Sequence, residues 1–151
     1  DGEWYLLSSS TTKAGANTNR DININIASSY INGKILQPNE KFSFWDTVGK
    51  CTYDKGYKDA TVYNNGKKTK GIGGGVCQVS TTVNMAVKSA GIKTNARQHS
   101  LPVSYASRED EATVSFGNTD FKFTNTTGKT IMLVMGSVDG SCTCEVWAKY
   151  E

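Results

Sequence analysis

Residues 71–82 read GIGGGVCQVSTT, so a glycine-rich run leads directly into a cysteine. Glycine is the residue that a chain uses where φ is positive or where another group approaches the backbone closely. A purely structural cysteine needs neither property. A nucleophile benefits from both, because unshielded amide N–H groups around Gly74 and Gly75 can bind the oxyanion formed when a thiolate attacks a carbonyl. Cys77 is therefore a candidate nucleophile for acyl transfer.

Cys77 stands at the start of a predicted helix. Apolar residues recur after it at helical spacing as far as Ala90, and Gly91 is placed where a C-terminal glycine belongs. The unpaired amide groups and the dipole at a helix N-terminus favour a thiolate. We therefore expect the pKa of Cys77 to lie below the free-thiol value of about 8.5.

His99 is the one histidine of the chain and the natural candidate for the base that a cysteine nucleophile needs. A helix over residues 77–90 would be about 21 Å long. Residues 91–98, if extended, reach up to about 27 Å. The chain can therefore return along the helix and bring His99 to its N-terminal end, the order found in papain-like and NlpC-type cysteine enzymes.

A third residue that orients the imidazole could come from the segments after His99. Asp120, Glu111 and Asn118 are the candidates, and we favour Asp120. Arg97 lies two residues before the histidine. It could contact a substrate carboxylate as a bidentate donor, or it could be a surface charge.

Each of these features also has a structural interpretation. A single cysteine near a helix start is commonly a small buried hydrophobic residue, and a single histidine is commonly inert. A glycine-rich turn before a helix often binds phosphate, but the phosphate loop needs Lys and then Ser or Thr after its last glycine. Val76 and Cys77 stand there instead. It is the combination of glycine run, cysteine and reachable histidine that favours a catalytic site.

The pattern along the chain predicts an α+β fold in a single domain, residues 1–151, in which N-terminal helices precede a largely antiparallel sheet. Residues 1–18 read as an irregular lead-in. Residues 19–33 fit a helix capped by Asn19, although their alternating isoleucines also fit a strand. An aromatic strand end at 42–45, a strand at 60–63 and a turn at 64–66 are expected before the cysteine helix, which is itself buried. The later predicted strands are 101–106, 112–116, 121–125, 130–138 and 142–150.

Composition excludes several classes of protein. Of the 151 residues, 37% are hydrophobic, which is typical of a globular chain. The apolar run 131–135 is too short to span a membrane, so no transmembrane segment is expected. A net charge of +3 permits an anionic partner but does not indicate nucleic acid. The first residue is not methionine, which suggests a fragment of a longer protein.

The cysteines and the histidine do not match a metal site. Cys142 and Cys144 are two residues apart, which on a strand places both on one face. This spacing, with one histidine in the chain, does not fit a structural zinc site, so no metal or other cofactor is expected. Cys51 could form a disulfide with one of the pair if the domain is exported, and the sequence leaves this open.

Several motifs together resemble the VanW domain family. They are GGGVCQVSTT, the segments FSFWDTVG and GYKDA before it, and the segments RQHSLPVSY and ATVSFGNTDFKFTN after it. The likeness runs from about residue 20 to the C-terminal strands. The family occurs in exported or membrane-anchored proteins of Gram-positive bacteria and includes members regarded as L,D-transpeptidases. The resemblance therefore implies an enzyme outside the cell, in the wall or anchored at the outer face of the membrane.

By this resemblance, Cys77 and His99 match the motif's cysteine and histidine. The implied reaction begins when the Cys77 thiolate attacks the carbonyl of the third residue in a peptidoglycan stem tetrapeptide and expels the terminal D-alanine. The side-chain amine of a neighbouring stem would then resolve the thioester and give a 3→3 cross-link. Gln78 and Ser80 would support the loop or the helix start.

Trp45 and Tyr105 lie in the matching segments and are further candidates for substrate contact. The chain departs from the family's usual pattern at Glu109 and Glu111, where glycine and aspartate are typical.

Two other functions remain open at this point. A cysteine peptidase or amidase would use the same nucleophile but let water resolve the acyl-enzyme formed from a peptidoglycan stem. A non-catalytic wall-binding module would hold Cys77 for structural reasons. In each case the expected partners are peptidoglycan stem peptides, and the chain is expected to be a monomer.

Overall fold

The computed structural model describes residues 3–64 and 66–151. Two short 3-10 helices, Tyr53–Lys55 and Arg108–Asp110, accompany the α-helices and strands. In chain order, the α-helices and strands are β1 (Trp4–Lys13), α1 (Thr18–Ile31), β2 (Lys34–Leu36), β3 (Lys41–Ser43), α2 (Phe44–Val48), β4 (Asp59–Asn64), β5 (Lys67–Ile72), α3 (Val76–Ser89), β6 (Lys122–Thr124), β7 (Ile131–Val138) and β8 (Ser141–Lys149).

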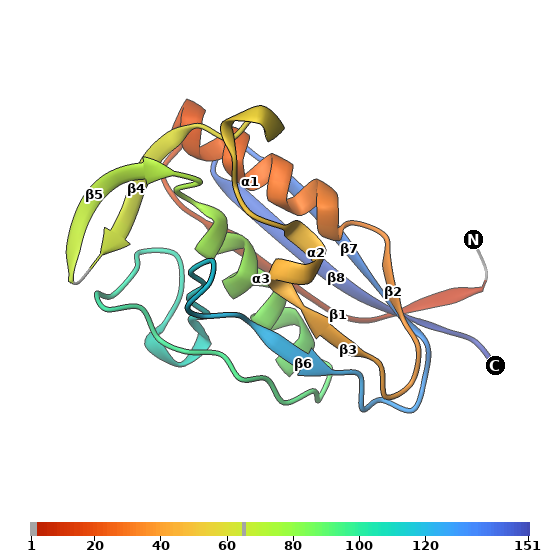
Figure 1. Ribbon diagram of the computed structural model, residues 1–151. Coiled ribbons are helices and arrows are strands. Elements are labelled where there is room, and N and C mark those ends of the chain that lie inside the picture. The colour runs from red at the N-terminus through yellow and green to blue at the C-terminus, as the bar shows by residue number, and fades with distance from the viewer. Residues whose placement is uncertain (1–2, 65) are drawn as a thin grey trace.

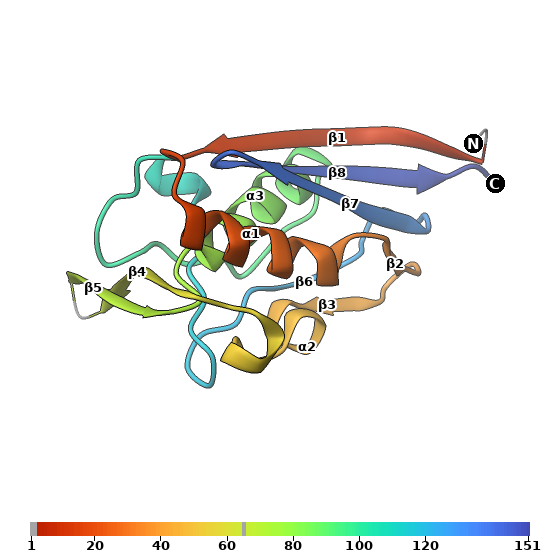
Figure 2. The ribbon, with the colours of Figure 1, turned by 90° about the horizontal axis from the view of Figure 1, so that it is seen from above.

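An antiparallel sheet of four strands, in the order β1-β8-β7-β2, forms one layer of the molecule. Both long helices, α1 and α3, lie on the same face of this sheet (Figure 2). Two further antiparallel pairs complete the strands: β3 with the distant β6, and β4 with its neighbour β5 (Figure 1). Helices on one face of an antiparallel sheet are an α+β arrangement, so the predicted fold class is confirmed.

The core fills the space between the sheet and the two helices. Alternate residues of β7 and β8 are buried, which is the period expected of strands with one covered face. Cys142 and Cys144 both belong to this buried row and have no exposed surface. The prediction that they share one face is confirmed. They and Cys51 are free thiols, so the disulfide left open by the sequence is not formed in this structure.

Helix α3 runs through the middle of the molecule. It begins at Val76, one residue before the predicted start, and its apolar residues Val79 and Val83 have no exposed surface. The helix ends ahead of Gly91, whose φ is +87°. A left-handed residue at this place is the usual end of a helix, so the predicted role of Gly91 is confirmed.

Helix α1 confirms the helical interpretation of residues 19–33. Its N-cap is Asn17 and not Asn19, because the Asn17 side chain accepts a hydrogen bond from the Arg20 N–H. The expected strand end at residues 42–45 divides into β3 and α2, because the Ser43 hydroxyl accepts from the Asp46 N–H and starts a helical turn.

The prediction that residues 1–18 form an irregular lead-in is wrong, since β1 occupies most of this segment. Its strand partner is β8, in a register that runs from Trp4 opposite Lys149 to Lys13 opposite Ser141. The run of serines and threonines in β1 lacks the apolar alternation of a typical strand. The strand exists because a distant segment supplies its hydrogen bonds.

The strands expected at 101–106 and 112–116 are also wrong, apart from an isolated bridge between Ser115 and Thr119. In the second segment, the backbone N–H and carbonyl of Ala112 form hydrogen bonds with the Thr81 and Ser80 side chains of α3 and not with another strand. The predicted turn at 64–66 includes residue 65, which lies outside the described residues. Within the described part of the chain, no helix is long and apolar enough to cross a bilayer.

Candidate active site

The glycine run forms a tight turn between β5 and α3. Gly75 has φ +109°, in the left-handed region that L side chains rarely adopt. Gly74 is required for space, because a Cβ atom there would lie 2.5 Å from the Thr61 carbonyl oxygen and 2.6 Å from the Ala60 carbonyl carbon. Gly75 is therefore favoured by its backbone conformation and Gly74 by lack of space, at the point where the chain enters α3.

Asn23 of α1 holds this turn in place. Its fully buried amide nitrogen donates to the carbonyls of Gly74 (2.8 Å) and Lys58 (2.9 Å). Because a trans peptide points its N–H opposite to its C=O, this bond turns the Gly75 N–H away from α1. The N–H groups of Gly75 and Cys77 make no hydrogen bond to any described residue, so both are candidate oxyanion donors.

The Cys77 thiol is half-buried against the segment that follows His99. Its Sγ atom accepts from the Val114 N–H (3.4 Å), donates to the Val114 carbonyl (3.4 Å) and lies 3.8 Å from the Thr113 hydroxyl. Burial raises the pKa of the thiol, and the smaller effects of Val114, Thr113 and the Arg20 charge lower it. The expected fall in this pKa is therefore wrong, because burial of the thiol outweighs the groups that favour a thiolate.

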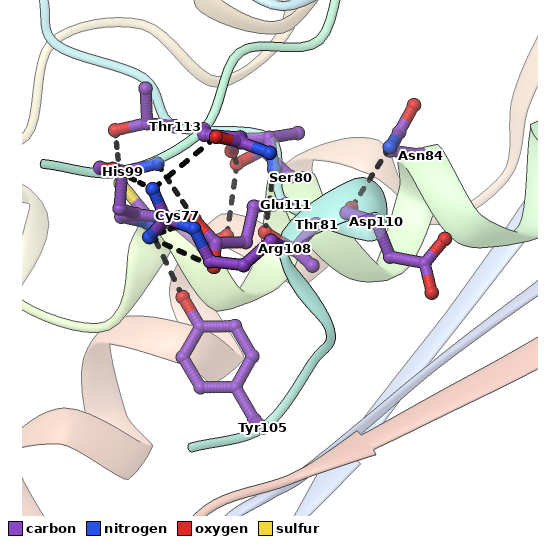
Figure 3. A network of polar contacts seen from close by, with 12 residues as sticks. Cys77, Ser80, Thr81, Asn84, His99, Tyr105, Arg108, Asp110, Glu111 and Thr113 are labelled. Atoms are coloured by element: carbon purple, nitrogen blue, oxygen red, sulfur yellow. Dashed lines mark hydrogen bonds and ion pairs between the residues drawn. The ribbon is translucent and has the colours of Figure 1, made fainter. Parts of the chain in front are cut away.

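His99 is buried and hydrogen bonded at both ring nitrogens. Nδ1 lies 3.1 Å from Glu111 Oε1, and Nε2 lies 3.5 Å from the Tyr105 hydroxyl (Figure 3). Since a carboxylate only accepts, Nδ1 carries the proton and Nε2 presents its lone pair. Burial lowers the pKa of His99, and the bond to Glu111 opposes this. At neutral pH the imidazole is thus uncharged and able to take a proton.

Glu111 fixes this imidazole through several bonds. Its side chain is 0% exposed, and Oε1 also accepts from the His99 backbone N–H at 2.7 Å. The Arg108 guanidinium lies 3.4 Å from Oε1 and donates to the His99 carbonyl at 3.1 Å. Arg108 and Glu111 therefore hold both the ring and the backbone of His99.

The preference for Asp120 as the orienting residue is wrong. Its carboxylate accepts from the Ser43 hydroxyl and from the Trp45 N–H (3.0 Å) at the start of α2. The side chain that contacts His99 Nδ1 is Glu111, the second of the three candidates.

The polar residues after Cys77 hold the segment that carries Glu111. The Ser80 hydroxyl donates to the carbonyls of Ala112 and Cys77, and the Thr81 hydroxyl accepts from the Ala112 N–H at 3.0 Å. Asn84 donates to the Asp110 carbonyl at 2.9 Å. These bonds lie on either side of Glu111 along the chain (Figure 3). Ser80 and Thr81 of the QVSTT stretch therefore fix the segment whose carboxylate contacts His99.

Cys77 and His99 both line a cavity of about 630 Å³ at the N-terminal end of α3. Its walls include most of the residues expected at the site: Gly74, Gly75, Gln78, Trp45 and Tyr105. Asp120, Ser80 and Arg97 do not line it, and the Arg97 side chain is exposed. Among the described residues, no group of three His, Cys, Asp or Glu side chains could hold a metal ion.

A family model described as VanW like protein matches residues 19–147, which include the whole glycine turn, α3, His99 and Glu111. The chain belongs to the VanW-like protein family. The resemblance noted from the motifs is therefore confirmed.

Two curated relatives support this VanW-like assignment. The uncharacterized protein YoaR of Bacillus subtilis (strain 168) is 39% identical over 127 residues, which are 83% of this chain and 42% of YoaR. The vancomycin B-type resistance protein VanW of Enterococcus faecalis (strain ATCC 700802 / V583) is 30% identical over 142 residues, 88% of this chain and 46% of that protein. The chain thus spans less than half the length of either relative. No solved structure matches it.

Sequence reasoning on this VanW-like chain missed three residues at the site. Arg108 could have been found, because it stands three residues before Glu111 on a helical turn. Arg20 and Cys51 also line the cavity, but they come from α1 and from the segment after α2. No local pattern connects either of them to Cys77, so only the folded chain could reveal them.

Proposed function

We propose that this chain is the catalytic domain of a peptidoglycan L,D-transpeptidase that uses Cys77 as nucleophile and His99 as base. The observation that carries the proposal is the shared cavity. One wall holds a cysteine beside unpaired amide N–H groups, and another holds a neutral histidine fixed by a buried carboxylate. Membership of the VanW-like family, with a relative named for vancomycin resistance, supports a cell-wall substrate.

In the first step, His99 Nε2 takes the Cys77 proton while Sγ attacks the carbonyl carbon of the third residue in a stem tetrapeptide. The N–H groups of Gly75 and Cys77 bind the oxyanion that forms. The tetrahedral intermediate collapses with cleavage of the C–N bond to the terminal D-alanine. The proton held by His99 passes to the leaving amine, and a thioester remains on Cys77.

In the second step, the side-chain amine of a neighbouring stem attacks the thioester carbonyl. The new C–N bond forms as the C–S bond breaks, and the amine gives up a proton to His99 Nε2. That proton returns to Sγ and restores the neutral thiol. The product is a 3→3 cross-link.

The electrostatics favour a general-base reaction over a preformed thiolate–imidazolium pair. Burial raises the pKa of Cys77 and lowers that of His99, so both groups are uncharged at neutral pH. The Nδ1–H bond to Glu111 then stabilises the imidazolium that forms during attack. In this proposal the domain acts as a monomer on the outer face of a Gram-positive cell, in the wall or anchored to the membrane.

Product analysis tests the proposal. Purified disaccharide-tetrapeptide muropeptides are incubated with the wild type and with Cys77→Ala, and the products are identified by mass spectrometry. A dimer that has lost one D-alanine, formed by the wild type alone, is the expected result. Free D-alanine with shortened monomers and no dimer would indicate a hydrolase, and no change with a folded protein would contradict catalysis.

A further inference from the structure

The cavity beside Cys77 is positively charged. Arg20 of α1 and Lys50, which follows α2, both line it, and none of its described lining residues is Asp or Glu. Lys50 lies at the outer part, with its ammonium group 6.0 Å from the centre of the exposed Phe116 ring. A cavity with two cations and no acid attracts an anionic group of the substrate.

Within residues 3–64 and 66–151, the partners that hold Arg20 in this cavity are neutral. Its Nη2 donates to Gln78 Oε1, and its guanidinium lies 5.6 Å from the centre of the Tyr105 ring. No carboxylate among the described residues lies within 4.0 Å of it. The guanidinium therefore has no counter-ion among the described residues, and its charge opposes the larger effect of burial, which raises the pKa of Cys77.

Gln78 determines how Arg20 is held. The Gln78 amide is fully buried, and its nitrogen donates to the Thr12 hydroxyl and to the Gly140 carbonyl, both at 3.1 Å. These two donor bonds leave only the Gln78 oxygen for Arg20. The glutamine next to the nucleophile therefore positions an arginine that lies far away in the sequence.

We propose that Arg20 binds the C-terminal carboxylate of the donor peptide, with Lys50 adding long-range attraction. This inference rests on the proposed function. The residue that leaves carries its carboxylate within one residue length, about 3.8 Å, of the carbonyl that Cys77 attacks. The anchoring cation must therefore lie close to the thiol, and Arg20 lines the same cavity as Cys77. The planar guanidinium suits a carboxylate because it can donate two parallel N–H bonds.

The test compares two donors, the tetrapeptide with a free C-terminal carboxylate and the same peptide as a C-terminal carboxamide. Binding of each is measured by calorimetry on Cys77→Ala, which cannot turn over, and kcat/KM is measured with Cys77 present. Arg20→Gln removes the positive charge that would bind the carboxylate. Arg20→Lys keeps the charge but lacks the two parallel N–H donors of the guanidinium. Arg97→Gln is the matched control, because it removes the same charge from an exposed side chain outside the cavity.

We expect the chain with Arg20 to prefer the free carboxylate by about 10- to 100-fold, as a charge-assisted pair implies. Arg20→Gln should reduce this preference to about one, while its affinity for the carboxamide stays as before. Arg20→Lys should retain part of the preference, and Arg97→Gln should retain all of it. A loss of structure would instead weaken both donors equally. A preference for the free carboxylate that persists in Arg20→Gln, or no binding of either donor, would overturn the proposal that Arg20 binds the carboxylate.

The same data separate the two proposals. Arg20-dependent binding without any turnover would retain the anchor and contradict the transpeptidase. Cross-linking by the wild type with equal use of both donors would retain the transpeptidase and contradict the anchor. If Arg20→Gln does not fold, the result rests on Arg20→Lys and on the comparison of the two donors with Arg20 in place.

Discussion

Replacing Glu111 by glutamine should destabilise the fold and change the titration of His99 together. The carboxylate is fully buried and accepts from the His99 N–H at 2.7 Å, from Nδ1 at 3.1 Å and from Arg108 at 3.4 Å. The glutamine amide has nearly the same shape, and its oxygen can still face His99. The substitution therefore removes charge without opening a cavity.

The size of the effect follows from these three contacts. A bond to a charged group contributes about 1.5–3 kcal/mol and a neutral one about 0.5–1.5, so each His99 bond weakens by about 1 kcal/mol. The Arg108 contact is long and its side chain is 41% exposed, so this pair adds only about 0–1 kcal/mol. We expect Glu111→Gln to lower the free energy of unfolding by about 2–3 kcal/mol, which urea denaturation measures.

The second readout is the pKa of the imidazole. The Glu111 carboxylate raises the pKa of His99 against the larger effect of burial, so its removal should lower that pKa further. Since the chain has one histidine, its C2–H signal in NMR is unambiguous. Asp120→Asn is the control, because it removes a carboxylate that bonds Ser43 and Trp45 and should leave the titration unchanged. An unaltered titration in Glu111→Gln, with stability within about 0.5 kcal/mol of the wild type, would refute the reasoning.

Three further predictions concern the thiol, the turn and the helix. Alkylation of Cys77 by iodoacetamide, located by peptide mapping, should be slow at pH 7. Because burial raises the pKa of this thiol, the alkylation rate should increase with pH and reach its midpoint above the free-thiol value of about 8.5. A lower midpoint would show a preformed thiolate. Gly74→Ala places a Cβ atom 2.5 Å from the Thr61 oxygen and should cost about 3 kcal/mol in thermal unfolding, whereas Gly15→Ala, with nothing within 4 Å, should be neutral. Ser80→Ala removes a donor from the Ala112 carbonyl and should cost about 1–2 kcal/mol. Hydrogen exchange should then quicken in residues 110–113 but not in α1, and equal quickening in both would point to general destabilisation.

The features that the sequence predicts well are local ones. Helix α3 follows from the spacing of Val79 and Val83 and from the glycine at 91, because a buried helix needs one apolar face and a stop. The segment between Cys77 and His99 is long enough to return along the helix, which allows the two residues to line one cavity, as they do.

The features that the sequence does not predict depend on distant partners. Five of the ten residues of strand β1 are Ser or Thr, and its pairing partner β8 lies at the other end of the chain. The choice of Glu111 over Asp120 depends on bonds from Ser80 and Thr81 to Ala112, which hold the neighbouring carboxylate toward His99. Local pattern carries no information about these contacts.

The direction of the shift in the Cys77 pKa also depends on the folded structure and could not be predicted from local sequence. A helix N-terminus and an adjacent glycine turn favour a thiolate, and this much is visible in the sequence. The opposing effect is burial of the thiol, which exists only in the folded chain. Desolvation outweighs the local groups, so the sign of the shift reverses.

Trapping the acyl-enzyme tests the central claim most directly. A tetrapeptide donor whose side-chain amine is acetylated cannot serve as acceptor, so the thioester should accumulate and be seen by acid quenching, digestion and mass spectrometry. We expect an adduct equal to the donor less D-alanine on the peptide that contains Cys77. An adduct on Cys51 of the same cavity, or release of D-alanine while the Cys77 peptide stays unmodified, would contradict the claim.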